Sequence, residues 1–293
     1  MAIIGFVGLG HMGNPMAINL LNAGHDLVVY DLVPEARQVL LAKGAKAVNS
    51  PGEVTRNAEF VFTMLQSGEQ VSDVCMGNNG LFSTAKPGTL FIDCSSIDVN
   101  TSREITKCAI EKGFNMIDAP VSGGVAGAIN STLTIMVGGD VEAFERAKPI
   151  LQHLGKNIVH AGPAGNGQVA KICNNMILGI SMIAVSEAFT LGQKLGLDPQ
   201  KLFDISSKAS GSCWSMTQYN PVPGILENVP ANRDYQPGFT ANMMLKDLML
   251  SQTAAQSVTA NTPLGKHATE LYKQFVASGN GGLDFSGIIK QIS

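Results

Sequence analysis

Apolar and polar positions along the first half of the chain alternate between two patterns. Short runs rich in β-branched and aromatic residues predict strands, and the stretches between them have the wider spacing of amphipathic helices. Such an alternation is typical of βαβ units, which build a parallel sheet. We expect strands at AIIGFVG (2–8), DLVVYD (26–31), EFVFTML (59–65), TLFIDCS (89–95), FNMIDAP (114–120), LTIMVGG (133–139) and NIVHAG (157–162).

The pattern changes after Gly162. From about residue 165 to residue 292 the apolar spacing is helical, interrupted by a long loop at roughly 211–239, and no segment has the alternation of a strand. The simplest account is an α/β domain with a mostly parallel sheet over residues 1–163. An all-α domain for substrate binding and oligomerisation would follow over residues 164–293.

Length and composition narrow the class of protein. The chain has 293 residues, of which 45% are hydrophobic and 15% charged, as is typical of a well-buried globular enzyme. A net charge of −3 predicts neither a nucleic-acid nor a membrane partner. The first residues, MAIIGFVGLG, lack the positive leader of a signal peptide. Five scattered cysteines without a C-x-x-C pair favour reduced thiols. We therefore expect a cytoplasmic enzyme.

One apolar segment, residues 172–191, is long enough to suggest a membrane span. Asn174, Asn175 and Glu187 interrupt it, so we interpret it as part of a buried helix over 168–195. Its apolar residues lie on nearly all faces, which predicts burial on all sides. A chain of this size can hardly cover such a helix alone, and this indicates a homodimer or a homotetramer.

A glycine-rich turn follows the first predicted strand and opens an amphipathic helix. Gly8, Gly10 and Gly13 have the spacing G-x-G-x-x-G. In this context the first glycine allows a tight turn, the second lets a pyrophosphate approach the backbone, and the third lets the helix pack on the strand. The phosphates would meet the N-terminal end of that helix. The motif predicts a Rossmann-type dinucleotide-binding domain. The remaining residues of the turn are counted with the cofactor site, with an exposed position at the helix start as the alternative for His11: Leu9, His11 and Met12.

Asp31 ends the second predicted strand, about 20 residues beyond the motif. Its carboxylate can accept hydrogen bonds from the adenosine ribose hydroxyls, and it would repel a 2′-phosphate. No arginine follows it directly, so we expect NAD as the cofactor rather than NADP. Ligands of such sheets lie beyond the carboxyl ends of the strands. Residues at two further strand ends are therefore candidates for cofactor contact, with simple strand-end packing as the alternative: Met64, Leu65, Ser95 and Ser96.

The segment DAPVSGGVAGA (118–128) follows another predicted strand. The hydroxyl of Ser122 beside the backbone amides of Gly123 and Gly124 would make a small concave site for a carboxylate. The alternative is an ordinary glycine-rich loop between a strand and a helix.

Lys171 stands alone in an almost uncharged helical stretch, GNGQVAKICNN (165–175). Burial of its charge would cost several kcal/mol unless the amine is paired or functional. Asn175 follows four residues later, on the same helix face. The helix begins at the predicted junction of the two domains, where a hydride transfer would need a group that moves the hydroxyl proton. The alternative is a lysine that extends along the helix to solvent.

Four segments, in this order, resemble the β-hydroxyacid dehydrogenase family over essentially the whole chain: GFVGLGHMGNPMAINL, DAPVSGGVAGA, GPAGNGQVAKICNN and KDLMLS. The resemblance implies an NAD-dependent oxidation of a small β-hydroxy acid, with Lys171 as the catalytic residue and Asn175 as its support. It also implies that Lys246 has a role beside the cofactor. The substrate contacts it implies are those of Ser122, Gly123 and Gly124.

The loop at 212–239 and the terminal LDFSGIIKQI resemble most closely the family members that oxidise 3-hydroxyisobutyrate. Trp214 and Phe239 in this loop either form an apolar wall around the substrate or pack within the domain. A tartronate semialdehyde reductase shares all four segments, although YNPVPG argues against it. A 6-phosphogluconate dehydrogenase should have a longer helical region. A non-catalytic dinucleotide sensor would not need a proton-transfer group. No residue spacing suggests a metal site, and none is expected.

Overall fold

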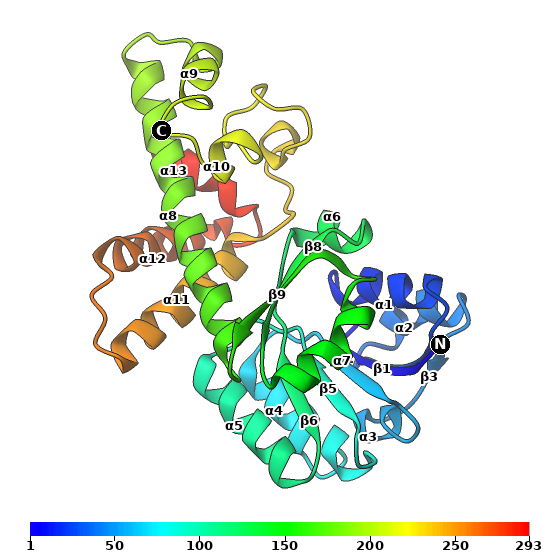
Figure 1. Ribbon diagram of the computed structural model, residues 1–293. Coiled ribbons are helices and arrows are strands. Elements are labelled where there is room, and N and C mark those ends of the chain that lie inside the picture. Colours follow the sequence, from blue (N-terminus) through cyan, green and yellow to red (C-terminus); the bar gives the residue numbers. More distant parts are fainter. Residues whose placement is uncertain (293) are drawn as a thin grey trace. The chain divides into compact units, whose positions relative to one another are not determined.

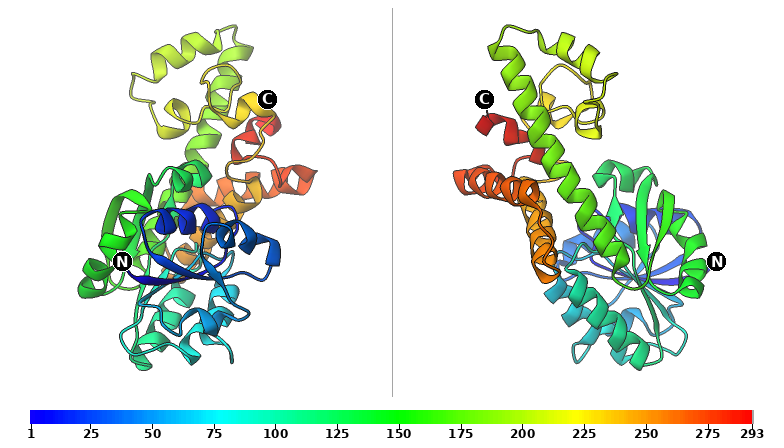
Figure 2. Two further views of the ribbon diagram at one scale, coloured as in Figure 1. Left: turned by 90° about the vertical axis from the view of Figure 1, so that its right-hand side faces the viewer. Right: turned by 60° about the vertical axis from the view of Figure 1, so that its left-hand side comes forward.

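The computed structural model describes residues 1–292, and the chain divides into two compact units, Met1–Lys171 and Ile172–Ser293 (Figure 1). The division falls inside helix α8 (Asn166–Lys194), so the first turns of this helix belong to the first unit. Figure 2 shows α8 as one long continuous helix.

The first unit is built on a single mostly parallel sheet. Its strand order is β3-β2-β1-β4-β5-β6-β8-β7, with β9 paired to β8. The pairs from β3 to β6 are parallel, and so is β8 with β9, whereas β8 runs antiparallel to β6 and β7. The predicted sheet is confirmed. The strands are β1 (Ile3–Val7), β2 (Asp26–Tyr30), β3 (Lys46–Ala47), β4 (Phe60–Thr63), β5 (Leu90–Asp93), β6 (Asn115–Asp118), β7 (Val121–Ser122), β8 (Leu133–Gly138) and β9 (Gly155–Gly162).

Helices cover both faces of this sheet because successive residues of a buried strand point to opposite sides (Figure 1). In β1, Phe6 belongs to a core shared with α1, α2 and α7, and Val7 belongs to a second core shared with α3, α4 and α5. The helices of this unit are α1 (Gly13–Asn22), α2 (Pro34–Leu41), α3 (Pro51–Val54), α4 (Gly68–Met76), α5 (Val99–Glu111), α6 (Gly124–Ile129) and α7 (Val141–Leu151), with a 3₁₀ turn η1 (Leu81–Ser83).

The strand order places a topological switch between β1 and β4, since the chain leaves β1 toward β2 and later returns to β1's other edge. Ligands of doubly wound sheets bind beyond the carboxyl ends of the strands at such a point. The glycine-rich turn after β1 and the Met64–Leu65 segment after β4 both lie there.

The second unit is helical, as predicted, and within residues 172–292 its one strand-like contact is an isolated bridge between Thr240 and Asp284. Its core contains Met244, Tyr272 and Phe285, which are almost fully buried. Besides α8, the helices are α9 (Pro199–Ser206), α10 (Trp214–Thr217), α11 (Ala241–Ser257), α12 (Pro263–Phe275) and α13 (Ile289–Ile292), with the short turns η2 (Pro230–Arg233), η3 (Val276–Asn280) and η4 (Phe285–Ile288).

The single chain leaves one side of α8 exposed, and burial of that side by a second copy stays a prediction. Ile177 and Leu195 are 66% and 77% exposed. Five exposed apolar residues follow one another at spacings of seven, four, three and four positions, which places them along one side of the helix, and the exposed Glu187 lies at the edge of that side. By length and composition α8 could also cross a membrane, a test that core helices of soluble proteins pass too. We call the exposed apolar side of the helix the exposed α8 face, and we include Leu195, which directly follows the last helical residue. Its members are Ile177, Ala184, Ala188, Leu191 and Leu195.

Candidate active site

The glycine-rich turn after β1 has the geometry that a dinucleotide requires. A Cβ on Gly13 would lie 1.9 Å from the carbonyl oxygen of Gly8, and a Cβ on Gly8 would lie 2.3 Å from the carbonyl oxygen of Met64. Gly8 also has a φ of +93°, which glycine adopts readily. Gly10 has no atom within 4 Å of where its Cβ would be. The outer glycines are therefore required by packing, whereas the central one borders the open space that a pyrophosphate would fill.

Asp31 is turned toward this glycine-rich turn. Its Oδ2 accepts a hydrogen bond from the backbone amide of Leu9 at 2.6 Å, and its Oδ1 accepts one from the amide of Val33 at 2.8 Å. The Leu9 side chain is buried in the core, so this residue offers the site only its backbone. His11 is exposed at the start of α1, and Met12 precedes the helix as its N-cap. The carboxylate thus lies beside the turn, where the ribose of a dinucleotide is bound in such domains.

The candidates at the ends of β4 and β5 differ in character. Ser95 is fully buried, and its hydroxyl accepts a hydrogen bond from the Leu65 amide at 2.8 Å. This hydroxyl holds the two strand ends together, which is the packing alternative noted above. Met64 and Ser96 are half-buried and line the same end of the sheet.

A buried carboxylate that the sequence analysis did not single out lies at the end of β5. Oδ1 of Asp93 accepts hydrogen bonds from the Thr63 hydroxyl at 2.7 Å and the Ser95 amide at 3.1 Å. Its Oδ2 is buried and has no hydrogen-bond partner among residues 1–292. Burial raises the pKa of Asp93 to about 6, although the bonds from Ser95 and Thr63 oppose the rise.

A second overlooked carboxylate, Asp118, ends the neighbouring strand β6. It accepts hydrogen bonds from the amides of Gly165 at 2.7 Å and Gln168 at 2.9 Å, at the N-terminal end of α8. Burial raises the pKa of Asp118, and these backbone bonds oppose that rise. A carboxylate satisfies the free amides of a helix N-terminus and complements its dipole. Asp118 therefore anchors α8 on the sheet.

The predicted carboxylate site lies where β7 leads into α6. Ser122 is half-buried in β7, and Gly123 and Gly124, which open α6, have φ angles of +133° and +62°. Gly124 has no atom within 4 Å of where its Cβ would be. Two successive glycines in conformations that L side chains rarely adopt leave the backbone beside the Ser122 hydroxyl uncovered, as a small anion would require.

Lys171 and Asn175 lie one turn apart on α8 and are both buried. Lys171 is 8% exposed, so it does not extend to solvent as the alternative interpretation required. The Asn175 amide donates a hydrogen bond to Oδ2 of Asp247 at 2.5 Å and accepts one from Asn174 at 2.9 Å. The asparagine is thus held from two sides.

Asp247 is a further residue that sequence reasoning missed. Its neighbour Lys246 has its Nζ 3.4 Å from Oδ1 of Asp247, and the aspartate side chain is 5% exposed. The lysine of this ion pair is therefore partly exposed, whereas the aspartate is buried. A signal was available in the sequence, because Lys246 and Asp247 together interrupt the otherwise apolar stretch MMLKDLML.

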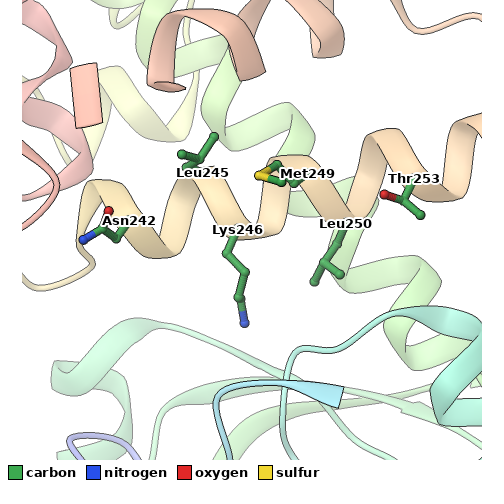
Figure 3. Close-up of a pocket in the computed structure, with 6 residues that line it drawn as sticks. All are labelled: Asn242, Leu245, Lys246, Met249, Leu250 and Thr253. Carbon is green, nitrogen blue, oxygen red and sulfur yellow. The ribbon is translucent and has the colours of Figure 1, made fainter. Parts of the chain in front are cut away.

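Lys246 also lines a hollow along helix α11. Figure 3 shows its side chain extended away from the helix. The hollow is mostly apolar and contains one cationic side chain, and the role beside the cofactor that the family resemblance implies for Lys246 stays a prediction. Its lining residues all belong to α11 and are Asn242, Leu245, Lys246, Met249, Leu250 and Thr253.

The aromatic residues of the long loop form a stack within the second unit. Trp214 lies on Tyr219 with ring centroids 5.0 Å apart, and Tyr219 lies on Phe285 at 5.3 Å. Phe239 meets the same Phe285 edge-on, so it packs within the domain. The Tyr219 hydroxyl donates to Oδ2 of the buried Asp284 at 3.0 Å, and burial raises its pKa. Trp214 remains half-exposed at the end of the stack.

Two family comparisons match this architecture. Residues 3–162 match the family described as the NAD binding domain of 6-phosphogluconate dehydrogenase. Residues 165–292 match the family described as NAD-binding of NADP-dependent 3-hydroxyisobutyrate dehydrogenase. Together with the open cradle at Gly10, they define the class of protein as an NAD-dependent oxidoreductase.

Full-length relatives narrow the class further. A probable mitochondrial 3-hydroxyisobutyrate dehydrogenase of Dictyostelium discoideum is 49% identical over 97% of this chain and 88% of its own. An NAD-dependent L-serine dehydrogenase of Pseudomonas aeruginosa is 47% identical over 98% of this chain and 96% of its own. A solved structure of Mycobacterium tuberculosis 3-hydroxyisobutyrate dehydrogenase with L-serine has a TM-score of 0.95 and is 44% identical. The match covers 100% of this chain and 99% of that one. The chain belongs to the 3-hydroxyisobutyrate dehydrogenase family, which confirms the resemblance seen in the sequence.

Proposed function

We propose that the protein oxidises 3-hydroxyisobutyrate to methylmalonate semialdehyde with NAD, as in the breakdown of valine. The observation that carries the proposal is the burial of Lys171 and Asn175 one turn apart on a helix that Asp118 anchors at the carboxyl ends of the strands. A buried amine at this end of a dinucleotide-binding sheet is suited to move a proton during hydride transfer. The names of the relatives support the substrate.

In this proposal the substrate carboxylate accepts hydrogen bonds from the Ser122 hydroxyl and from the backbone amides of Gly123 and Gly124. Lys171, in its neutral form, takes the proton of the substrate hydroxyl as the carbonyl forms. Bound NAD supplies the nicotinamide that accepts the hydride from the hydroxyl carbon. One proton and one hydride leave the alcohol, so atoms and charge balance. Asn175 lies one helical turn from Lys171, and its hydrogen bonds with Asp247 and Asn174 keep its side-chain amide in a fixed orientation.

We also propose that NAD is preferred over NADP. Asp31 presents a carboxylate beside the turn, and a 2′-phosphate would be repelled by it. The residues that follow, Leu32 and Val33, are exposed and carry no positive charge that could offset this repulsion.

L-serine is a second candidate substrate. It shares the carboxylate and the 3-hydroxyl with 3-hydroxyisobutyrate and differs in having an amine where the latter has a methyl group. The name of a relative that is 47% identical favours it, as does the L-serine named with the Mycobacterium tuberculosis structure. Tartronate semialdehyde reduction is a third candidate, since its chemistry would use the same motifs.

The deciding experiment measures initial rates of NADH formation with 3-hydroxyisobutyrate, 3-hydroxypropionate, L-serine and glycerate, and repeats them with NADP. Lys171→Ala should lower kcat by about 10²- to 10⁴-fold while NAD binding is retained. Lys194→Ala, at the exposed end of the same helix, is the matched control. Preference for L-serine or glycerate would change the substrate. Full turnover by Lys171→Ala would reject the proposed mechanism, and tight NAD binding without any turnover would indicate a sensor.

We further propose that the protein forms a homodimer or homotetramer through the exposed α8 face. Exposed apolar residues along one side of a helix form a surface that is rarely left in water, and their near-heptad spacing suits packing against another helix. A second copy of this chain is the proposed occupant, because the stripe consists of apolar side chains with the charged Glu187 at its edge, and two alanines at its centre allow close approach.

We propose a cytoplasmic location. Within residues 1–292 all five cysteines are free thiols, a state that persists in a reducing compartment. Fractionation of cells with an antibody to the protein tests this, and recovery from an oxidising compartment would contradict it.

A further inference from the structure

We propose that Gln168 is a positioning residue that holds the first turns of α8, and with them Lys171, at a fixed place relative to the 95–97 segment after β5. The inference rests on the proposed function, because it takes Lys171 as the proton-transfer group. It assigns a role to a residue that touches neither substrate nor the reacting atoms.

The side chain of Gln168 binds two backbone groups on either side of Ser96. Its Nε2 donates to the carbonyl oxygen of Ser95 at 2.8 Å, and its Oε1 accepts from the amide of Ile97 at 3.1 Å. The residue is fully buried. A side-chain amide offers a donor and an acceptor side by side, so glutamine is chemically matched to the pair.

The backbone of the same residue is anchored as well. The amide of Gln168 donates to Asp118 at 2.9 Å, so the residue is tied to the ends of both β5 and β6. The helix start has no room to shift, since a Cβ on Gly167 would lie 2.4 Å from the carbonyl oxygen of Met136. Asp118 fixes where the helix begins, and Gln168 ties it to the neighbouring strand end.

Lys171 follows Gln168 by three residues, about 4.5 Å along the helix axis and on the same side. The 95–97 segment lies beyond the carboxyl end of β5, which is the side of the sheet where ligands bind. Hydride and proton transfer must occur in one geometry, and a displacement of about 1 Å can cost about 100-fold in rate. Gln168 links the segment on the cofactor side to the helix that supplies the proton acceptor.

The test compares Gln168→Met, which keeps the length of the side chain and removes both hydrogen bonds, with Gln168→Glu, which keeps the acceptor and loses the donor. We expect kcat to fall about 10- to 100-fold in Gln168→Met, with less than a threefold change in the KM for NAD. The primary deuterium isotope effect on kcat should rise, and its pH profile should shift. Gln193→Met, at the exposed far end of α8, is the matched control.

A readout independent of activity is the hydrogen exchange of the Ile97 amide in the cofactor-free protein, which should accelerate in Gln168→Met and stay protected in Gln168→Glu. A lower Tm with unchanged kcat, isotope effect and pH profile would show a purely structural residue and overturn the inference. If Gln168→Met does not fold, Gln168→Glu carries the kinetic comparison by itself. Failure of the proposed function is recognised separately, by full turnover in Lys171→Ala.

Discussion

The carboxylate of Asp31 accepts a hydrogen bond from the backbone amide of Leu9, with Oδ2 only 2.6 Å from the nitrogen. The two residues lie at the ends of neighbouring parallel strands, β2 and β1. The side chain that we propose as the selector of the ribose is therefore tied to the turn that we expect to receive the pyrophosphate. A substitution at Asp31 should disturb both parts of the cofactor site.

Asp31→Asn should raise the KM for NAD about 10-fold or more and reduce the preference for NAD over NADP. The amide keeps the shape of the side chain but loses the charge, and hydrogen bonds to charged groups contribute about 1.5–3 kcal/mol. Steady-state kinetics with both cofactors measure this. Asp26→Asn, an exposed change at the other end of β2, should leave the KM for NAD and the preference for NAD over NADP within twofold of the wild-type values. An unchanged cofactor ratio in Asp31→Asn would contradict the selector role.

The glycines of the turn should separate folding from cofactor binding. Gly10→Ala has open space for its methyl group, so we expect an unchanged Tm and a loss of NAD affinity, because the methyl group enters the pyrophosphate cradle. Gly13→Ala would place its Cβ 1.9 Å from the Gly8 carbonyl oxygen, so we expect a marked fall in Tm. Calorimetry and NAD titration of both variants are the measurements. If Gly10→Ala binds NAD with wild-type affinity, the pyrophosphate does not lie against Gly10 as proposed.

Asn175 and Asp247 should be strongly coupled in stability. Asn175→Ala leaves the buried Asp247 without one of its hydrogen bonds, which should lower the free energy of unfolding by about 1–3 kcal/mol. A double-mutant cycle with Asp247→Ala should give a coupling of about 1.5–3 kcal/mol. Denaturant unfolding of the four proteins measures it. Additive effects of the two substitutions would argue against the bond.

Asp93 should make folding stability depend on pH. Burial raises the pKa of Asp93 from 3.8 to about 6, so the folded state holds this proton more tightly than the unfolded state does. The stabilisation of the folded state by this proton is fully present below about pH 4 and is lost as the pH rises to about 6. The free energy of unfolding should fall by about 3 kcal/mol over this interval.

The stability of Asp93→Asn, which does not titrate, should therefore rise relative to wild type across that interval and reach a plateau above it. Urea unfolding of both proteins from pH 4 to pH 8 gives the difference. The buried amide of the variant adds only a constant offset, so the slope is the diagnostic quantity. A difference that is flat across the interval would show that Asp93 is not titrating there.

Charges on the exposed α8 face should dissociate the proposed oligomer. Leu191→Glu and Ile177→Glu each place a charge in the apolar stripe, and we expect a smaller assembly at micromolar concentration by sedimentation velocity. Leu264→Glu, an equally exposed apolar position at the start of α12, is the control and should sediment as wild type does. A wild-type protein that is monomeric at these concentrations would refute the interface.

The sequence by itself determined the class of the first unit. The glycine spacing, the following helix and Asp31 all lie within one βαβ unit, so their relation is set by short stretches of chain whose periodicity is visible. The buried strands were predicted for the same reason. The strands β3 and β7 were missed, because two residues carry no periodicity.

Only the tertiary structure decided the partners of the buried polar groups. Asp118 meets Gln168 across 50 residues, Gln168 meets Ser95 across 73, and Asn175 meets Asp247 across 72. Local spacing predicts which face of an element is apolar, but it does not state which distant backbone or side chain will satisfy a buried donor or acceptor. That choice depends on how strands and helices close on one another. For this reason the sequence could indicate Lys171 as a candidate for proton transfer, whereas the hydrogen bonds of Gln168 at the start of the same helix are seen only in the fold.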